Sequence, residues 1–204
     1  MSKARVEAFS DGVFAIAITL LVLTLVTPAV GTADVSRALL DEWPGYAAYA
    51  VSFIVIGIMW VNHHALIARL AGVDRVFLFL NLLLLMTVVF LPYPTGVLGR
   101  FLEAGHGATP AAVMYSVTME VNALAWTALW TWAAVGRRLL GDAFPADQVR
   151  RSVLRFGAGN VPYTATIAVA FVSAPICLAL HGAIAVYYVV DQFGAADGQL
   201  VSND

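Results

Sequence analysis

Apolar segments of about 20 residues follow one another along this chain, and each is long enough to cross the ~30 Å hydrocarbon core of a bilayer as a helix. One stretch, from Phe156 to Val190, contains no charged residue, yet a single helix over it would be about 50 Å long. Ser173 and Pro175, near its middle, therefore predict two helices joined by a turn. The predicted spans lie at about 9–30, 45–69, 75–98, 110–136, 156–174 and 176–192.

The composition leaves little room for anything besides these helices. Hydrophobic residues make up 61% of the chain and charged residues 12%, whereas soluble domains are about half apolar and a quarter charged. The sequence therefore predicts an all-α integral membrane protein with six transmembrane helices in a single domain over residues 1–204. The net charge of −2 and the lack of a basic run argue against a nucleic-acid partner.

Basic residues are distributed unequally between the two ends of the predicted helices. Only Arg37 and Arg100 fall on the side away from the termini. Because cytoplasmic loops of membrane proteins carry the excess of Lys and Arg, both termini are predicted to be cytoplasmic. The nine basic residues on the side of the termini are Lys3, Arg5, Arg69, Arg75, Arg137, Arg138, Arg150, Arg151 and Arg155.

The first span carries Arg5 and Asp11 at its entrance, where ionisable groups need partners and suggest function. At about 100° per residue, Asp11 lies about 140° away from Ile16, so its carboxylate is expected to point toward other helices. Arg5 and Asp11 are also too far round the helix to form an i,i+4 pair. The face centred on Ile16 carries aliphatic residues and a threonine, namely Ile16, Thr19, Leu20 and Leu23.

Candidate partners for Asp11 lie in the second and third spans at a comparable depth. Trp60 and His64 share a helix face, His63 is rotated by about 100° from His64, and Asn81 lies in the corresponding part of the third span. Adjacent histidines that diverge by this angle cannot ligate one ion from a single helix, and no cysteine lies nearby. We therefore expect no metal site, with one histidine bonded near Asp11 and the other facing an interface.

Three motifs together resemble the transmembrane protein 175 potassium-channel family, in particular its prokaryotic six-helix members. The first is R-x-x-x-F-S-D, formed by Arg5, Phe9, Ser10 and Asp11. The second is W-V-N-H-H at 60–64, and the third is the run at 81–95 that begins N-L-L-L-L. They occur in the family's order, and the resemblance covers most of the chain.

The resemblance implies a homotetramer in which the first helix of each subunit lines a central cation pore. It implies a potassium channel that is weakly selective over sodium and has no T-V-G-Y-G filter, a motif that this chain also lacks. The constriction would be a stack of aliphatic side chains, matched here by Ile16, Leu20 and Leu23. Thr19 would form the selectivity layer.

The family's polar signature residues are implied to hold neighbouring helices together by hydrogen bonds. The resemblance also implies a bacterial inner membrane location, potassium as the permeant ion, surrounding lipid and no cofactor. The matching signature residues are Arg5, Phe9, Ser10, Asp11, Trp60, His63, His64 and Asn81.

Other functions stay open at this stage. A proton-coupled carrier or a proton-permeable channel would use Asp11, Glu120 and a histidine such as His181, although Glu120 is also compatible with an ordinary interhelical hydrogen bond. Carriers often contain internal repeats or matching broken helices, and this sequence shows neither. An enzyme is not expected, because the sequence contains no metal-ligand cluster, nucleophile elbow or phosphate loop.

Overall fold

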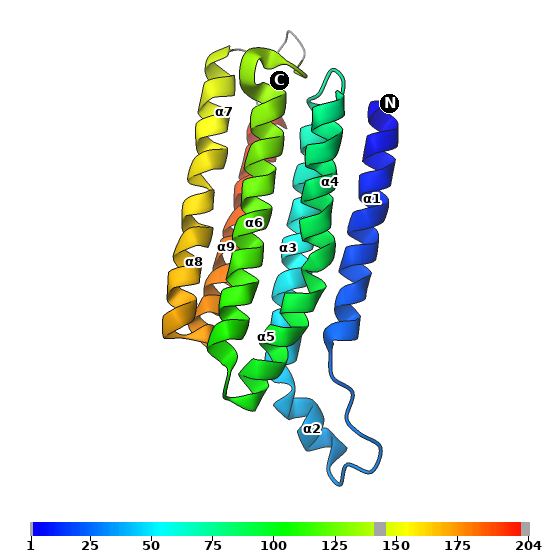
Figure 1. The fold of residues 1–204 in the computed structure, drawn as a ribbon, viewed down its shortest axis with the longest axis vertical. Helices are drawn as coiled ribbons and strands as arrows, with labels where there is room; N and C mark the ends of the chain where they lie inside the picture. Colours follow the sequence, from blue (N-terminus) through cyan, green and yellow to red (C-terminus); the bar gives the residue numbers. More distant parts are fainter. Residues whose placement is uncertain (1, 141–145, 201–204) are drawn as a thin grey trace.

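The computed structural model describes residues 2–140 and 146–200, and the regular elements in this part of the chain are helical (Figure 1). The elements are α1 (Lys3–Leu20), the 3-10 helix η1 (Leu21–Thr24), α2 (Val35–Asp41), α3 (Trp43–Ala68), α4 (Arg75–Phe90), α5 (Pro92–Ala104), α6 (Ala108–Ala134), the 3-10 helix η2 (Val135–Arg137), α7 (Ala146–Ala158), α8 (Asn160–Val172) and α9 (Ala174–Leu200).

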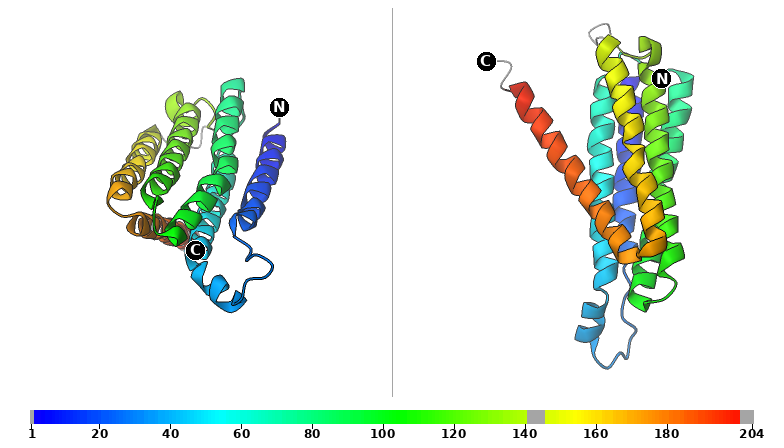
Figure 2. Two further views of the ribbon diagram at one scale, coloured as in Figure 1. Left: turned by 60° about the horizontal axis from the view of Figure 1, so that its bottom comes forward. Right: turned by 90° about the vertical axis from the view of Figure 1, so that its left-hand side faces the viewer.

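The long helices form an elongated bundle (Figure 1), and the later part of α9 diverges from it in the right-hand view of Figure 2. Helix α1 lies at one edge and packs on α3 and α4. Helix α6 packs on α4, α5 and α8, and α9 packs on α3 and α8. The N-terminus lies at one end of the bundle, and the short helix α2 projects at the other.

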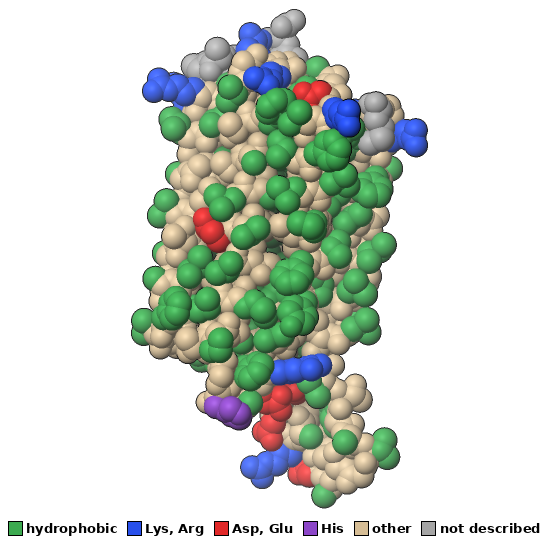
Figure 3. Space-filling view, viewed as in Figure 1, with side chains coloured by type: hydrophobic (Ala, Val, Ile, Leu, Met, Phe, Trp, Pro, Cys, Tyr) green, Lys and Arg blue, Asp and Glu red, His purple; other side chains and the backbone are tan. Residues whose placement is uncertain are grey.

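Charged side chains gather at the two ends of the bundle (Figure 3). The visible Lys and Arg side chains lie mostly at the end with the N-terminus, and the flank between the ends is largely hydrophobic. Within the described residues, three helical stretches are long and apolar enough to cross a membrane: Lys3–Thr24, Trp43–Ala68 and Arg75–Ala104. This distribution of charge is the one expected of a helical protein embedded in a bilayer.

Helix α1 begins at Lys3, six residues before the predicted start of the first span at residue 9. The prediction followed hydropathy, but the charged residues of the entrance are good helix formers and continue the same helix outward. At the far end, the backbone becomes extended at Leu25 (φ −72°, ψ 136°), before the proline at position 28. The helical part therefore ends at Thr24, short of the predicted residue 30.

The later helices differ from the predicted spans in how they are divided. The predicted third span, 75–98, is helical but is interrupted at Leu91, and Pro92 begins a separate helix that continues to Ala104. Proline is well suited to the first turn of a helix, where its missing N–H is not needed. The predicted fifth span, 156–174, corresponds to the end of α7 and all of α8, and α7 continues that direction in Figure 1. Ser173 is extended between α8 and α9.

Polar side chains inside the bundle bond mainly to one another across helices. The Ser52 hydroxyl on α3 lies 2.8 Å from that of Thr95 on α5 and 2.9 Å from that of Tyr115 on α6. The Ser116 hydroxyl on α6 lies 3.1 Å from Nε2 of His181 on α9. Such contacts satisfy groups that lipid cannot, and they fix the helices relative to one another.

Candidate functional site

Helix α1 presents two chemically different faces. One face packs on α3 and α4 and buries Val6, Ser10, Phe14 and Ala17. The opposite face is uncovered in the single chain, where Ile16 is 58% exposed, Leu20 38% and Leu23 73%. Thr19 is exposed between them. The helical periodicity that placed these four residues on one face therefore matches a face that the chain leaves open.

A buried amide connects α1, α3 and α4 on the covered side. Asn81 of α4 donates from Nδ2 to the Ser10 hydroxyl at 3.1 Å, and its Oδ1 accepts a hydrogen bond from Nε2 of His63 on α3 at 2.8 Å. All three residues are buried. Because Nε2 is the donor, His63 Nδ1 is the acceptor nitrogen of the neutral ring, and it has no partner among the described residues. This set of contacts, here called the Asn81 bridge, ties the signature serine to two helices.

Two further contacts lie at the margins of the same interface. Trp60 donates its indole N–H to the Asp11 carboxylate at 2.9 Å. His64 Nδ1 lies 2.9 Å from the Glu7 carboxylate, so His64, expected to face an interface, has a partner within its own chain. Asp11 is half-buried and lies off the Ile16 face, toward α3.

Arg5 and Phe9 lie apart from these contacts. Phe9 is 53% exposed, and Arg5 is exposed on the same side of α1. Within the described part of the chain, Arg5 has neither an ion pair nor a hydrogen bond to a side chain. The structure therefore brings together Ser10, His63 and Asn81, and separately Asp11 with Trp60, but leaves the first two signature residues facing outward.

The Thr19 hydroxyl bonds to a backbone carbonyl of its own helix. It donates to the Ile16 carbonyl at 2.9 Å, three residues back, instead of to Ala15, four residues back. Thr87 in α4 and Thr166 in α8 make the same i−3 bond, since a helical threonine hydroxyl can reach the carbonyl either three or four residues back. With its hydrogen donated inward, the hydroxyl oxygen retains lone pairs that can face an ion.

The other two ionisable residues that the sequence analysis singled out lie away from α1. His181 is buried among α6, α8 and α9, and its Nδ1 has no partner among the described residues. Glu120 on α6 is half-buried, and its Oε2 also lacks a hydrogen bond. Among the side chains that the structure describes, those of residues 2–140 and 149–188, no group of three His, Cys, Asp or Glu could hold a metal ion.

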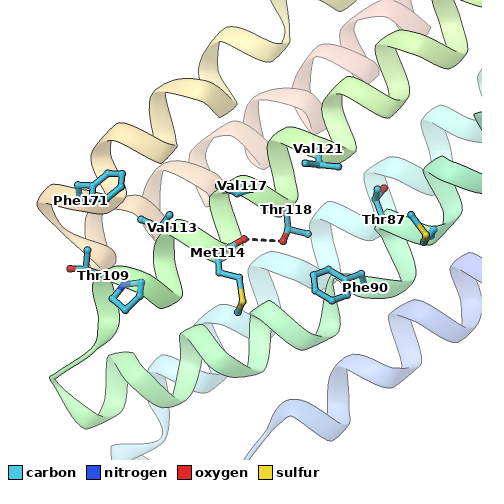
Figure 4. Close-up of a pocket in the computed structure, with 11 residues that line it drawn as sticks. Thr87, Phe90, Thr109, Val113, Met114, Val117, Thr118, Val121 and Phe171 are labelled. Atoms are coloured by element: carbon cyan, nitrogen blue, oxygen red, sulfur yellow. Dashed lines mark hydrogen bonds between the residues drawn. The ribbon is translucent and has the colours of Figure 1, made fainter.

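An apolar pocket of about 740 Å³ lies on the flank of the bundle, away from α1 (Figure 4). Two of its three threonines donate within their own helices, Thr118 to the Met114 carbonyl at 2.8 Å and Thr87 to the Leu84 carbonyl at 2.7 Å. The lining contains no ionisable side chain, and the pocket lies apart from the signature residues. The candidate functional site is therefore the open face of α1 together with the Asn81 bridge behind it.

Known proteins share both the sequence and the fold of this chain. Residues 5–92 match the family described as endosomal/lysosomal potassium channel TMEM175. A potassium channel of Streptomyces collinus is 49% identical over 191 residues, which is 93% of each chain. The crystal structure of a lysosomal potassium-selective channel TMEM175 homolog from Chamaesiphon minutus is 36% identical, with a TM-score of 0.83 over 93% of this chain and 97% of that chain.

Animal relatives match over a smaller part of their length. The endosomal/lysosomal proton channel TMEM175 of Gallus gallus is 33% identical over 68% of this chain but only 29% of the relative. The fold and the matched motifs define a helical membrane protein of an ion-channel class, which is not an enzyme class. This chain belongs to the TMEM175 family, and the resemblance of its three motifs to that family is confirmed.

Sequence reasoning missed the contact between His64 and Glu7. The signal was present, since Glu7 lies one turn before Asp11 on the same helix and falls at a similar angle. The predicted first span began at residue 9 and so left Glu7 outside the helix. Predicting the contact would have required knowing that α1 extends outward beyond its apolar part, as far as Lys3.

Proposed function

We propose that this protein is a potassium-selective cation channel, weakly selective over sodium, in which the first helices of four identical subunits surround a central pore. The observation that carries the proposal is the open face of α1, which exposes aliphatic residues in successive layers while the opposite face is buried. Homologues named potassium channels support the permeant ion. The protein would be embedded in the bacterial cell membrane with six spans and both termini cytoplasmic, and it would need no cofactor.

The constriction is assigned to Ile16, Leu20 and Leu23. Four copies of each side chain around a narrow axis would form aliphatic rings that expel water, and a dewetted ring blocks hydrated ions until it widens. The exposure of these residues in the subunit is what such a ring requires. The Asn81 bridge would hold each α1 against its own subunit, so that the rings keep a defined diameter.

Thr19 is assigned to the selectivity layer between the Ile16 and Leu20 rings. Its hydroxyl hydrogen is donated to the Ile16 carbonyl, so four hydroxyl oxygens could accept contacts from a partly dehydrated cation. We expect Thr19→Val to lower the potassium-to-sodium permeability ratio, because valine has the same shape but no oxygen. The reversal potential under bi-ionic conditions measures this ratio.

The matched control for that measurement is Thr164→Val. Thr164 is exposed on α8, and its hydroxyl bonds to the Asn160 carbonyl of its own helix at 3.2 Å. It should leave the reversal potential unchanged. An unaltered reversal potential in Thr19→Val as well would remove Thr19 from the selectivity layer.

A proton-permeable channel is the second candidate function. Glu120 favours it, since its half-buried carboxyl has an oxygen without a partner in the described residues, and ionisable groups in the membrane often mark proton routes. The chicken relative is named a proton channel. Potassium conduction ranks first because the relatives that match most of this chain are named potassium channels.

A further inference from the structure

A pocket of about 470 Å³ lies between α1 and α4, separate from the pocket of Figure 4. Arg5 and Phe9 of α1 lie on one wall, and Arg75, Phe79 and Leu82 of α4 lie on the other. Both helices begin at the end of the bundle that holds the N-terminus (Figure 1). The proposed constriction and the Asn81 bridge use none of these five side chains.

The pocket contains two positive charges that have no acidic partner in the described part of the chain. Arg5 makes no ion pair and no side-chain hydrogen bond there, and the Arg75 guanidinium carbon lies 5.8 Å from the centre of the Phe79 ring. A guanidinium over an aromatic ring keeps its five N–H donors. Both arginines are exposed, so their N–H groups are available to an anion.

The carboxylates nearest in sequence to these arginines have other partners. Asp74, the residue before Arg75, caps α4 and accepts the indole N–H of Trp132 at 3.0 Å. Glu7 lies 2.9 Å from Nδ1 of His64. The positive charge of the pocket is therefore left for a ligand to neutralise.

Charge gives way to apolar surface in the same direction on both walls. Phe9 follows Arg5 by one helical turn, and Phe79 follows Arg75 by one turn, so each ring lies about 6 Å closer to the middle of the bundle. Phe79 is 60% exposed, and Leu82, one turn deeper, is 48% exposed. The basic side chains of this end and the apolar flank beneath them are visible in Figure 3. A phospholipid has the same order, with its phosphate at the membrane surface and its acyl chains beneath.

The Asn81 bridge fixes the distance between the two walls. Asn81 borders the pocket and donates to the Ser10 hydroxyl at 3.1 Å, and both residues are buried. This hydrogen bond joins α4 to α1 behind the pocket. A ligand therefore meets a preformed site and does not have to bring the two helices together.

We propose that this pocket binds an anionic phospholipid, with its phosphate between the guanidiniums of Arg5 and Arg75 and an acyl chain along Phe9, Phe79 and Leu82. Guanidinium groups pair with phosphate oxygens through parallel N–H donors. A free phosphate would neutralise the arginines but leave the two aromatic rings uncovered, so the lining favours a lipid. The position in the cytoplasmic leaflet rests on the proposed function, whereas the site itself requires a bilayer and not potassium conduction.

Thermal unfolding of the delipidated protein in detergent tests the site. Dioleoylphosphatidylglycerol at about ten times its dissociation constant should raise the Tm by about 3–6 °C, and dioleoylphosphatidylcholine, which has no net charge, should raise it less. Arg5→Gln combined with Arg75→Gln should abolish the difference between the two lipids. Arg69→Gln is the matched control and should retain it, because Arg69 is exposed outside the pocket and bonds to the Ala65 carbonyl of its own helix at 3.0 Å.

Three results would overturn the proposal. The double variant would respond to phosphatidylglycerol as the wild type does if the arginines do not hold the lipid. Glycerol phosphate would stabilise the wild type as much as phosphatidylglycerol if the site binds a phosphate without acyl chains. Native mass spectrometry would find no bound phosphatidylglycerol on the wild type, and a changed oligomeric state in the double variant, if a neighbouring subunit fills the pocket. A protein that binds this lipid but passes no potassium would contradict the proposed function and support the lipid site.

Discussion

Ile16→Asn is expected to raise resting potassium conductance strongly, because four amides in place of four aliphatic groups would let water remain in the narrowest part of the pore. A dewetted ring excludes ions by withholding water, so its barrier falls once polar groups line it. Ile16 is 58% exposed in the subunit, so the substitution should leave the packing of α1 on α3 and α4 intact. We would measure the open probability at rest in reconstituted bilayers.

Ile16→Leu is the matched control for this experiment. Leucine keeps the volume and the apolar character of the ring, so a resting conductance like that of the wild type is expected. If Ile16→Asn conducts no more than Ile16→Leu, Ile16 does not form the gate. The constriction would then have to lie at Leu20 or Leu23, which the corresponding asparagine substitutions can separate.

Asn81→Leu is expected to destabilise the protein severely. The substitution removes the amide that bonds Ser10 and His63, and leaves both polar groups buried without a partner. At about 1–3 kcal/mol for each unsatisfied group, the expected loss is about 2–6 kcal/mol. A lower Tm and a smaller yield of assembled particles in size-exclusion chromatography would both report it.

Ser10→Ala provides a graded comparison for the Asn81 bridge. It removes one partner and leaves the bond between His63 and Asn81, at 2.8 Å, in place. Its loss of stability should therefore be smaller than that of Asn81→Leu. An Asn81→Leu protein that unfolds within about 1 kcal/mol of the wild type would show that the bridge contributes little beyond an apolar contact.

Helical periodicity was enough to predict the two faces of α1. The angle between Asp11 and Ile16 depends only on residue spacing, and the spacing does not change when the helix packs. The structure accordingly places Asp11 beside Trp60 and leaves Ile16 uncovered. The second and third spans also contain few polar residues at the depth of Asp11, which limited the possible hydrogen-bond partners of the first helix to Trp60, the two histidines and Asn81.

The hydrogen-bond partner of each polar side chain could not be predicted from residue spacing. Whether Asn81 bonds Ser10 or Asp11 depends on the crossing of α1, α3 and α4, and spacing within one helix does not fix that crossing. The hydrogen bond from the Val26 N–H to the Glu42 carboxylate could not be predicted either, because it joins residues 16 positions apart across an irregular loop. The i−3 bond of Thr19 could not be predicted either, because a helical threonine hydroxyl can bond the carbonyl three or four residues back.

Purified protein in liposomes provides the most direct test of the central claim, that ions pass through a pore formed by the first helices. With a potassium gradient and no proton gradient, we predict passive potassium flux and single-channel current steps, both increased by Ile16→Asn. Potassium movement that occurs only when a proton gradient is imposed, without current steps, would contradict the account and indicate a proton-coupled carrier.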